Sequence, residues 1–135
     1  MFVLWASAKV PGLLKPEQRK SIIDEALSKQ REDGGWSMSS VVVSGWKRRD
    51  GTALEAKSDG YATGVITFAL QQAGFPRDNS QLKRGLSWLV QNQDKTEGFW
   101  PAWSLNKQRD PASDPARFMS DAATAYAVLS LTRAN

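Results

Sequence analysis

The chain has 135 residues, of which 41% are hydrophobic and 24% charged, and this composition predicts one globular domain with a modest core. It contains no cysteine and no histidine, which excludes disulfides, thiol nucleophiles, histidine bases and Cys/His zinc sites. We therefore expect no metal and no cofactor. The net charge of +4 comes from scattered basic residues, so we do not expect nucleic-acid binding. No apolar run is long enough to span a bilayer.

Two segments carry apolar residues on one face only, at the spacing of an α-helix. The first begins near Pro16, a residue favoured in the first helical turn. Its apolar positions are Ile22, Ile23, Ala26 and Leu27. Those of the second are Leu82, Leu86, Leu89 and Val90. We expect both segments to be outer helices that bury one side.

Two other segments, 59–73 and 121–131, are apolar nearly all round, which predicts helices buried on every side. Asp59 and Asp121, each preceded by a serine, are suited to cap these helices, and Gly74 is suited to end the first one. Alternation of one-sided and all-round apolar helices predicts an outer and an inner layer. We therefore expect an all-α fold of about five helices, built from helical hairpins.

An internal repeat of about 60 to 64 residues relates these helix pairs. The segment 30–36 recurs at 93–100 with one inserted residue, and the loop 44–50 recurs at 104–110. We expect one domain, 1–135, with repeats of roughly 10–74 and 75–135. The alignment places Met1 in the middle of an inner helix, so the chain is expected to begin partway through a repeat.

The repeated segment resembles the QW motif of triterpene cyclases. The first copy has Gln-x3-Gly-x-Trp, and the second adds an Arg-Gly pair and a tryptophan before its glutamine. The residues of the two copies are Gln30, Gly34, Trp36, Trp88, Gln93, Gly98 and Trp100. The chain thus resembles the squalene–hopene cyclase and prenyltransferase-repeat family over almost its whole length. The resemblance implies a partial α/α toroid in which these motifs clamp adjacent repeats together.

Catalytic motifs of that family do not transfer to this chain. The Asp-x-Asp-Asp acid cluster of isoprenoid cyclases does not occur, and the zinc ligands of protein prenyltransferases would require the missing cysteine and histidine. The resemblance implies the C-terminal part of a terpene cyclase-like protein that acts on or binds hydrophobic isoprenoid ligands and is not catalytic alone. A noncatalytic repeat scaffold, for protein partners or hydrophobic ligands, is the alternative.

Candidate site residues follow from where the resembling toroid opens its cavity, at the N-terminal ends of the inner helices. Asp59 and Asp121 would lie there, either as acids or simply as helix caps. The repeated loops supply cations that would attract an anionic head group or order the loops; these are Lys47, Arg49, Lys107 and Arg109. Aromatic residues that would line an apolar cavity or belong to the core are Trp46, Tyr61, Trp103 and Tyr126.

Partners and location follow from the same resemblance. We expect an isoprenoid-type small molecule and a membrane surface as partners, with a cytoplasmic or peripheral membrane location. Inner helices of a short chain would expose apolar surface, which is unfavourable. We therefore expect either a homo-oligomer or an N-terminal portion of a parent protein to cover them.

Overall fold

The computed structural model describes residues 1–42 and 44–133, and this part of the chain is all-helical, as predicted. Its helices are α1 (Phe2–Ser7), α2 (Pro16–Ser28), α3 (Met38–Val41), α4 (Gly60–Gln72), α5 (Ser80–Gln91) and α6 (Asp114–Arg133). The described residues thus form six helices where about five were expected. The short α3 was not predicted; it starts where the Ser37 side chain accepts a hydrogen bond from the amide of Ser39.

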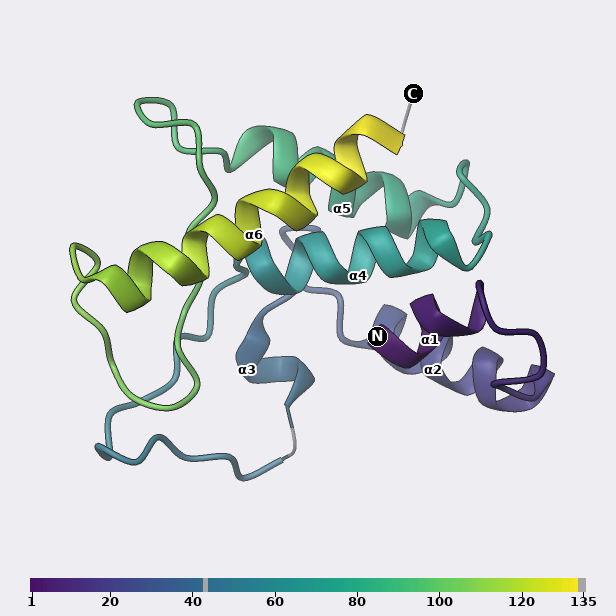
Figure 1. The fold of residues 1–135 in the computed structure, drawn as a ribbon, viewed down its shortest axis with the longest axis horizontal. Helices are drawn as coiled ribbons and strands as arrows, with labels where there is room; N and C mark the ends of the chain where they lie inside the picture. Colours follow the sequence, from purple (N-terminus) through teal and green to yellow (C-terminus); the bar gives the residue numbers. More distant parts are fainter. Residues whose placement is uncertain (43, 134–135) are drawn as a thin grey trace.

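Helix α4 forms the centre of the molecule, with α6 crossing beside it and α5 and α1 packed around it (Figure 1). Every residue from Ala62 to Leu70 is buried, which confirms the predicted burial on all sides. The helix ends as predicted: Gly74 follows it with a φ of 71°, a conformation that glycine adopts without strain. Apolar and small side chains all round α4 allow neighbours to cover it from several directions.

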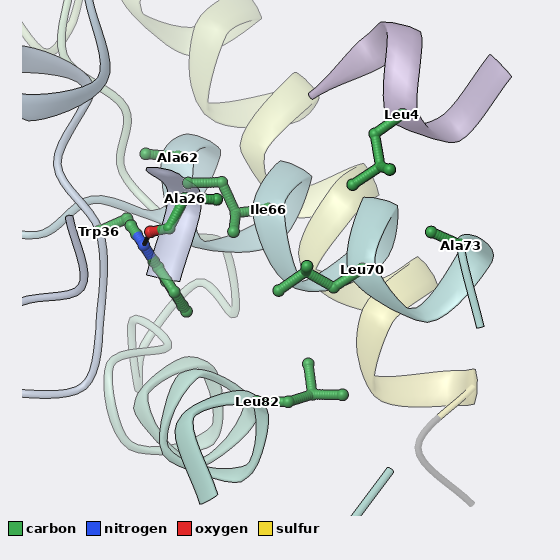
Figure 2. Packing of buried hydrophobic residues seen from close by; sticks show 8 residues of the cluster. All are labelled: Leu4, Ala26, Trp36, Ala62, Ile66, Leu70, Ala73 and Leu82. Carbon is green, nitrogen blue, oxygen red and sulfur yellow. Dashed lines mark hydrogen bonds between the residues drawn. The ribbon is translucent and has the colours of Figure 1, made fainter. Parts of the chain in front are cut away.

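The main apolar cluster joins α4 to the outer helices α2 and α5 and to α1. Figure 2 shows its buried members, which are Leu4, Ala26, Trp36, Ala62, Ile66, Leu70, Ala73 and Leu82. Helix α2 buries the predicted side, with Ile22, Ile23 and Leu27 partly buried against this cluster. On α5 the prediction for Val90 is wrong, because that side chain is 58% exposed. Trp88 takes its place on the buried face.

Helix α6 begins earlier than predicted. Its first residues are Asp114 and Pro115, an acid and a proline, both of which favour the first turn of a helix. Asp121 therefore lies inside the helix, and the prediction that it caps the second inner helix is wrong. Asp59, by contrast, does cap α4, since its Oδ1 accepts a hydrogen bond from the amide of Ala62 at 2.8 Å.

Only one side of α6 is buried, so the prediction of burial on every side is wrong for this helix. The buried side carries small residues, Ala116, Ala123, Ala127 and Ser130. It lies so close to α4 that a Cβ atom on Gly64 would come within 2.9 Å of the Ala127 amide nitrogen. The other side leaves Phe118, Val128 and Leu129 exposed.

The two copies of the glutamine–tryptophan motif make equivalent hydrogen bonds. Gln30 Nε2 donates to the carbonyl of Gly34 at 2.8 Å, and Gln93 Nε2 donates to that of Gly98 at 2.7 Å. The indole of Trp36 donates to the carbonyl of Ala26, and the indole of Trp100 donates to that of Leu89. In both copies the motif thus ties the loop back onto the preceding outer helix.

The first motif also holds α5 against the preceding part of the chain. Gln30 Nε2 donates to the carbonyl of Gln81, and the Arg84 guanidinium donates to Gln30 Oε1. A Cβ atom on Gly85 would lie 2.6 Å from the Trp36 ring, so only glycine lets the helix come this close. The indole of Trp88 donates to Asp33 Oδ2. These buried tryptophans therefore join helices to one another.

Candidate functional site

The two similar loops, 44–50 and 104–110, lie against each other. The Trp46 indole donates to the carbonyl of Leu105 at 2.8 Å, and the amide of Arg49 donates to that of Asn106 at 2.8 Å. In the other direction, the amide of Gln108 donates to Asp50 Oδ2 at 2.7 Å. Trp46 and the Arg49 backbone thus serve the pairing of the loops, while the side chains of Lys47, Arg49 and Lys107 are exposed.

Arg48 anchors this loop pair, a role that the sequence analysis missed. Its side chain is 4% exposed and donates twice to the carbonyl of Ser104, at 2.8 and 2.7 Å. It also donates to the carbonyl of Ala53 and forms an ion pair with Glu55. Three basic residues stand in a row at 47–49, and nothing in the pattern tells which of them points inward.

An open cavity of about 790 Å³ lies between these loops and the N-terminal half of α6. Of the residues predicted to contact a ligand, Trp103, Arg109 and Asp121 line it. Lining residues that were not predicted include Arg48, Phe99, Arg117 and Met119. The early start of α6 brings Arg117 and Met119 to the cavity, and this is why a prediction that began the helix at residue 121 could not find them.

Charges in this cavity are balanced. Three arginines, Arg48, Arg109 and Arg117, share the lining with the carboxylates of Glu55, Glu97 and Asp121. The ammonium group of Lys57 lies 4.5 Å from the centre of the Trp103 ring, in a cation–π contact. Such a lining suits a polar or zwitterionic group better than a purely apolar molecule.

Asp59 is a buried carboxyl group with a structural role. It is 1% exposed, and besides capping α4 it accepts a hydrogen bond from the amide of Met38 at 2.7 Å. Burial raises the pKa of Asp59 from 3.8 to about 6, against the backbone amides, which lower it. The carboxyl fixes the start of α4 to the start of α3, so the cap is the role that its surroundings support.

An aromatic cluster joins α1, α4 and α6, and it contains both predicted tyrosines. The Tyr126 ring centre lies 5.7 Å from that of Tyr61, 6.0 Å from Phe68 and 6.1 Å from Phe2. Trp5 meets Phe68 edge-on at 5.1 Å. Burial raises the pKa of Tyr61, with smaller contributions from Tyr126 and Asp59.

This cluster is open to solvent on one side. Phe68 is buried, whereas Tyr61, Tyr126 and Trp5 are half-buried and Phe2 is 50% exposed. We refer to the five rings of Phe2, Trp5, Tyr61, Phe68 and Tyr126 as the aromatic surface. Trp46 and Trp103, the other two predicted aromatic residues, lie at the loop pair and the cavity instead. The molecule therefore presents an open cavity with balanced charges and an aromatic surface as candidate sites.

Within the described residues, acidic side chains do not gather into a group that could hold a metal ion. Nor does any helix in residues 1–42 and 44–133 have the length and hydropathy that crossing a membrane requires. No protein family, curated protein or solved structure matches this chain.

Proposed function

We propose that this chain is part of a terpene (squalene–hopene) cyclase-like protein and binds a hydrophobic isoprenoid-type ligand on the aromatic surface, without catalysis of its own. The observation that carries the proposal is the set of ring contacts linking Tyr126 to Tyr61, Phe68 and Phe2 across three helices. Such a protein would act in the cytoplasm or at a membrane surface, where isoprenoids partition.

Half-exposed rings suit an unsaturated hydrocarbon for two reasons. Removing apolar area from water contributes about 25 cal/mol per Å², and ring faces make favourable contacts with flat π-systems such as alkenes. The edge contact between Tyr61 and Tyr126, with an interplanar angle of 88°, helps to hold these two rings in place before a ligand arrives. A preformed surface loses less entropy on binding.

The surroundings of the two candidate acids support the proposal that the chain alone does not catalyse. Protonation of an alkene needs an acid that reaches the substrate. Asp59 is engaged with the amides of Ala62 and Met38 and is 1% exposed. Asp121 is exposed on α6 and lines the cavity, whose lining includes none of the five rings of the aromatic surface. Incubation with squalene should therefore yield no cyclised product detectable by gas chromatography with mass spectrometry.

Titration with farnesol, an isoprenoid alcohol, followed by calorimetry tests the binding. Tyr126→Ala should weaken the affinity about tenfold, because it removes the ring at the centre of the surface. Phe118→Ala is the matched control, since this ring lies on the same helix, is 74% exposed and should not affect binding. Equal losses in both variants, or no farnesol binding by the unmodified chain, would refute the proposal.

The exposed side of α6 favours a second candidate, a scaffold that associates with a further copy of the chain. Its apolar residues Phe118, Ala122, Ala125 and Leu129 follow helical spacing and lie on one stripe. By the repeat, Ala125 corresponds to Gly64, the residue where α4 approaches α6 most closely. The stripe is thus equivalent to the face with which α4 packs on α6, which makes an inner helix of a second copy its natural occupant.

Light scattering coupled to size exclusion tests this scaffold. A discrete oligomer that the double variant Phe118→Ser/Leu129→Ser converts to monomer would support it. A chain that is monomeric at all concentrations would exclude the scaffold and leave ligand binding unaffected.

A further inference from the structure

Two side chains that line the cavity between the loop pair and α6 each carry a buried hydrogen-bond donor that has no acceptor among the described residues. Trp103 Nε1 and Arg109 Nε are both buried, and neither has a hydrogen-bond partner among the described residues. Both residues line the same cavity. Burying a hydrogen-bond donor without a partner is unfavourable, and native proteins leave few groups in this state. Two of them in one cavity indicate that a group with acceptor atoms binds there.

We propose that this cavity binds the oxyanion head group, a carboxylate or phosphate, of an amphipathic small molecule. Trp103 would donate one hydrogen bond and the Arg109 guanidinium would donate the others. Arginine suits the role because its planar fork matches the spacing of carboxylate and phosphate oxygens. The inference concerns a site apart from the aromatic surface and stands independently of isoprenoid binding there.

Neighbouring charges leave Arg109 available to an anion. Arg48 is neutralised by its ion pair with Glu55 and is held by the carbonyls of Ser104 and Ala53. The remaining lining charges are those of Arg109 and Arg117 against Glu97 and Asp121. With one excess positive charge nearby, that of Lys57 over the Trp103 ring, directed hydrogen bonds more than net attraction would select the ligand, and added salt should weaken binding only modestly.

The apolar residues of the lining would contact an apolar body attached to the head group of the ligand. Phe99, Pro101, Ala116 and Met119 contribute carbon surface to the same cavity. Its volume of about 790 Å³ falls within the range of about 300–1,000 Å³ that is usual for small-molecule sites. A free inorganic anion would leave most of this space and this apolar surface unused.

Calorimetric titration with octanoate, inorganic pyrophosphate and 1-octanol tests the proposal. Octanoate should bind at least about tenfold more tightly than 1-octanol, since only the carboxylate supplies charged acceptors. Pyrophosphate lacks an apolar body and should bind more weakly than octanoate, whereas tighter binding of pyrophosphate would indicate a phosphate head group. Equal affinity for octanoate and 1-octanol, or no binding of either anion at about 10 mM, would overturn the proposal.

Variants then assign the binding to this cavity. Arg109→Gln should weaken anion binding at least about tenfold, and Trp103→Phe, which keeps the ring and removes the donor, about threefold or more. Arg49→Gln is the matched control: it is the equivalent arginine of the other loop, is exposed and lies outside the cavity, so affinity should stay within about twofold.

Tyr126→Ala separates this site from the aromatic surface. It should leave octanoate binding unchanged while it weakens farnesol binding, so that failure of one site does not imply failure of the other. Circular dichroism checks that each variant folds. Unaltered anion binding by a folded Arg109→Gln variant would show that the cavity is not an oxyanion site.

Discussion

Helices α4 and α6 carry similar sequence patterns but have different surroundings. Their segments 59–73 and 121–131 are both apolar nearly all round, but α4 is buried from Ala62 to Leu70, whereas α6 leaves Phe118, Val128 and Leu129 exposed. The difference arises from neighbours, because α4 is packed by α6, α5 and α1 while α6 packs mainly on α4. An apolar pattern therefore shows which side chains of a helix favour burial. The neighbouring helices determine whether those side chains are in fact buried.

Replacing one leucine on each helix by alanine should give the largest difference in stability between α4 and α6. Leu70→Ala removes a fully buried side chain of α4 and should lower the free energy of unfolding by about 2–5 kcal/mol. Leu129→Ala on α6, where the side chain is 41% exposed, should change it by about 0.5 kcal/mol or less. Urea denaturation of the two variants measures both effects. Similar losses would mean that α6 is covered in solution.

The pH dependence of stability should distinguish the acids of the two helices. Because the pKa of Asp59 is raised to about 6 in the folded chain, the folded state binds more protons than the unfolded state between about pH 4 and 6. The free energy of unfolding should thus rise as the pH falls through this window, by up to about 3 kcal/mol from this residue. Above pH 6, Asp59 no longer adds this contribution to the free energy of unfolding.

Two asparagine variants isolate that contribution. Asp59→Asn should abolish the rise between pH 6 and 4 and cost about 1–2 kcal/mol at neutral pH, because an amide group cannot accept from both Ala62 and Met38. Asp121→Asn, at an exposed position of α6, is the control for replacing a carboxyl group by an amide. A rise that persists in Asp59→Asn would contradict the assignment.

A smaller effect is expected where the two helices touch. Alanine normally stabilises a helix relative to glycine by about 1 kcal/mol, but Gly64→Ala places a Cβ atom 2.9 Å from the Ala127 amide nitrogen. We expect Gly64→Ala to destabilise the chain by about 1–2 kcal/mol. The reverse change at the equivalent position of α6, Ala125→Gly, should cost about 1 kcal/mol through helix propensity alone. Thermal unfolding compares the two, and a stabilising Gly64→Ala would mean that the helices are farther apart.

The sequence predicted the parts of the fold that depend on local chemistry. Pro16 at the start of α2, Asp59 at the start of α4 and Gly74 at its end have the predicted positions, since each acts through its own backbone. The start of α6 was predicted seven residues too late, at 121 instead of 114, because the segment before it lacks an apolar period. Capping preferences identify a possible helix start but cannot exclude an earlier one.

The candidate sites were only partly predictable for a related reason. Tyr61 and Tyr126 were identified because they lie on the inner helices, but their partners Phe2 and Trp5 come from α1, and only tertiary packing brings them together. Arg48 could not be distinguished from its basic neighbours, because its burial depends on the carbonyl of Ser104, more than fifty residues away. Long-range contacts of this kind leave no periodic signal in the sequence.

The most direct test of the central claim uses the two tyrosines of the chain, both of which belong to the aromatic surface. Protein labelled with fluorotyrosine should give two ¹⁹F resonances, one from α4 and one from α6. Titration with farnesol should shift both with the same dissociation constant, since the two rings lie 5.7 Å apart and would contact one ligand. Farnesol binding that shifts neither resonance would contradict a ligand site on this surface.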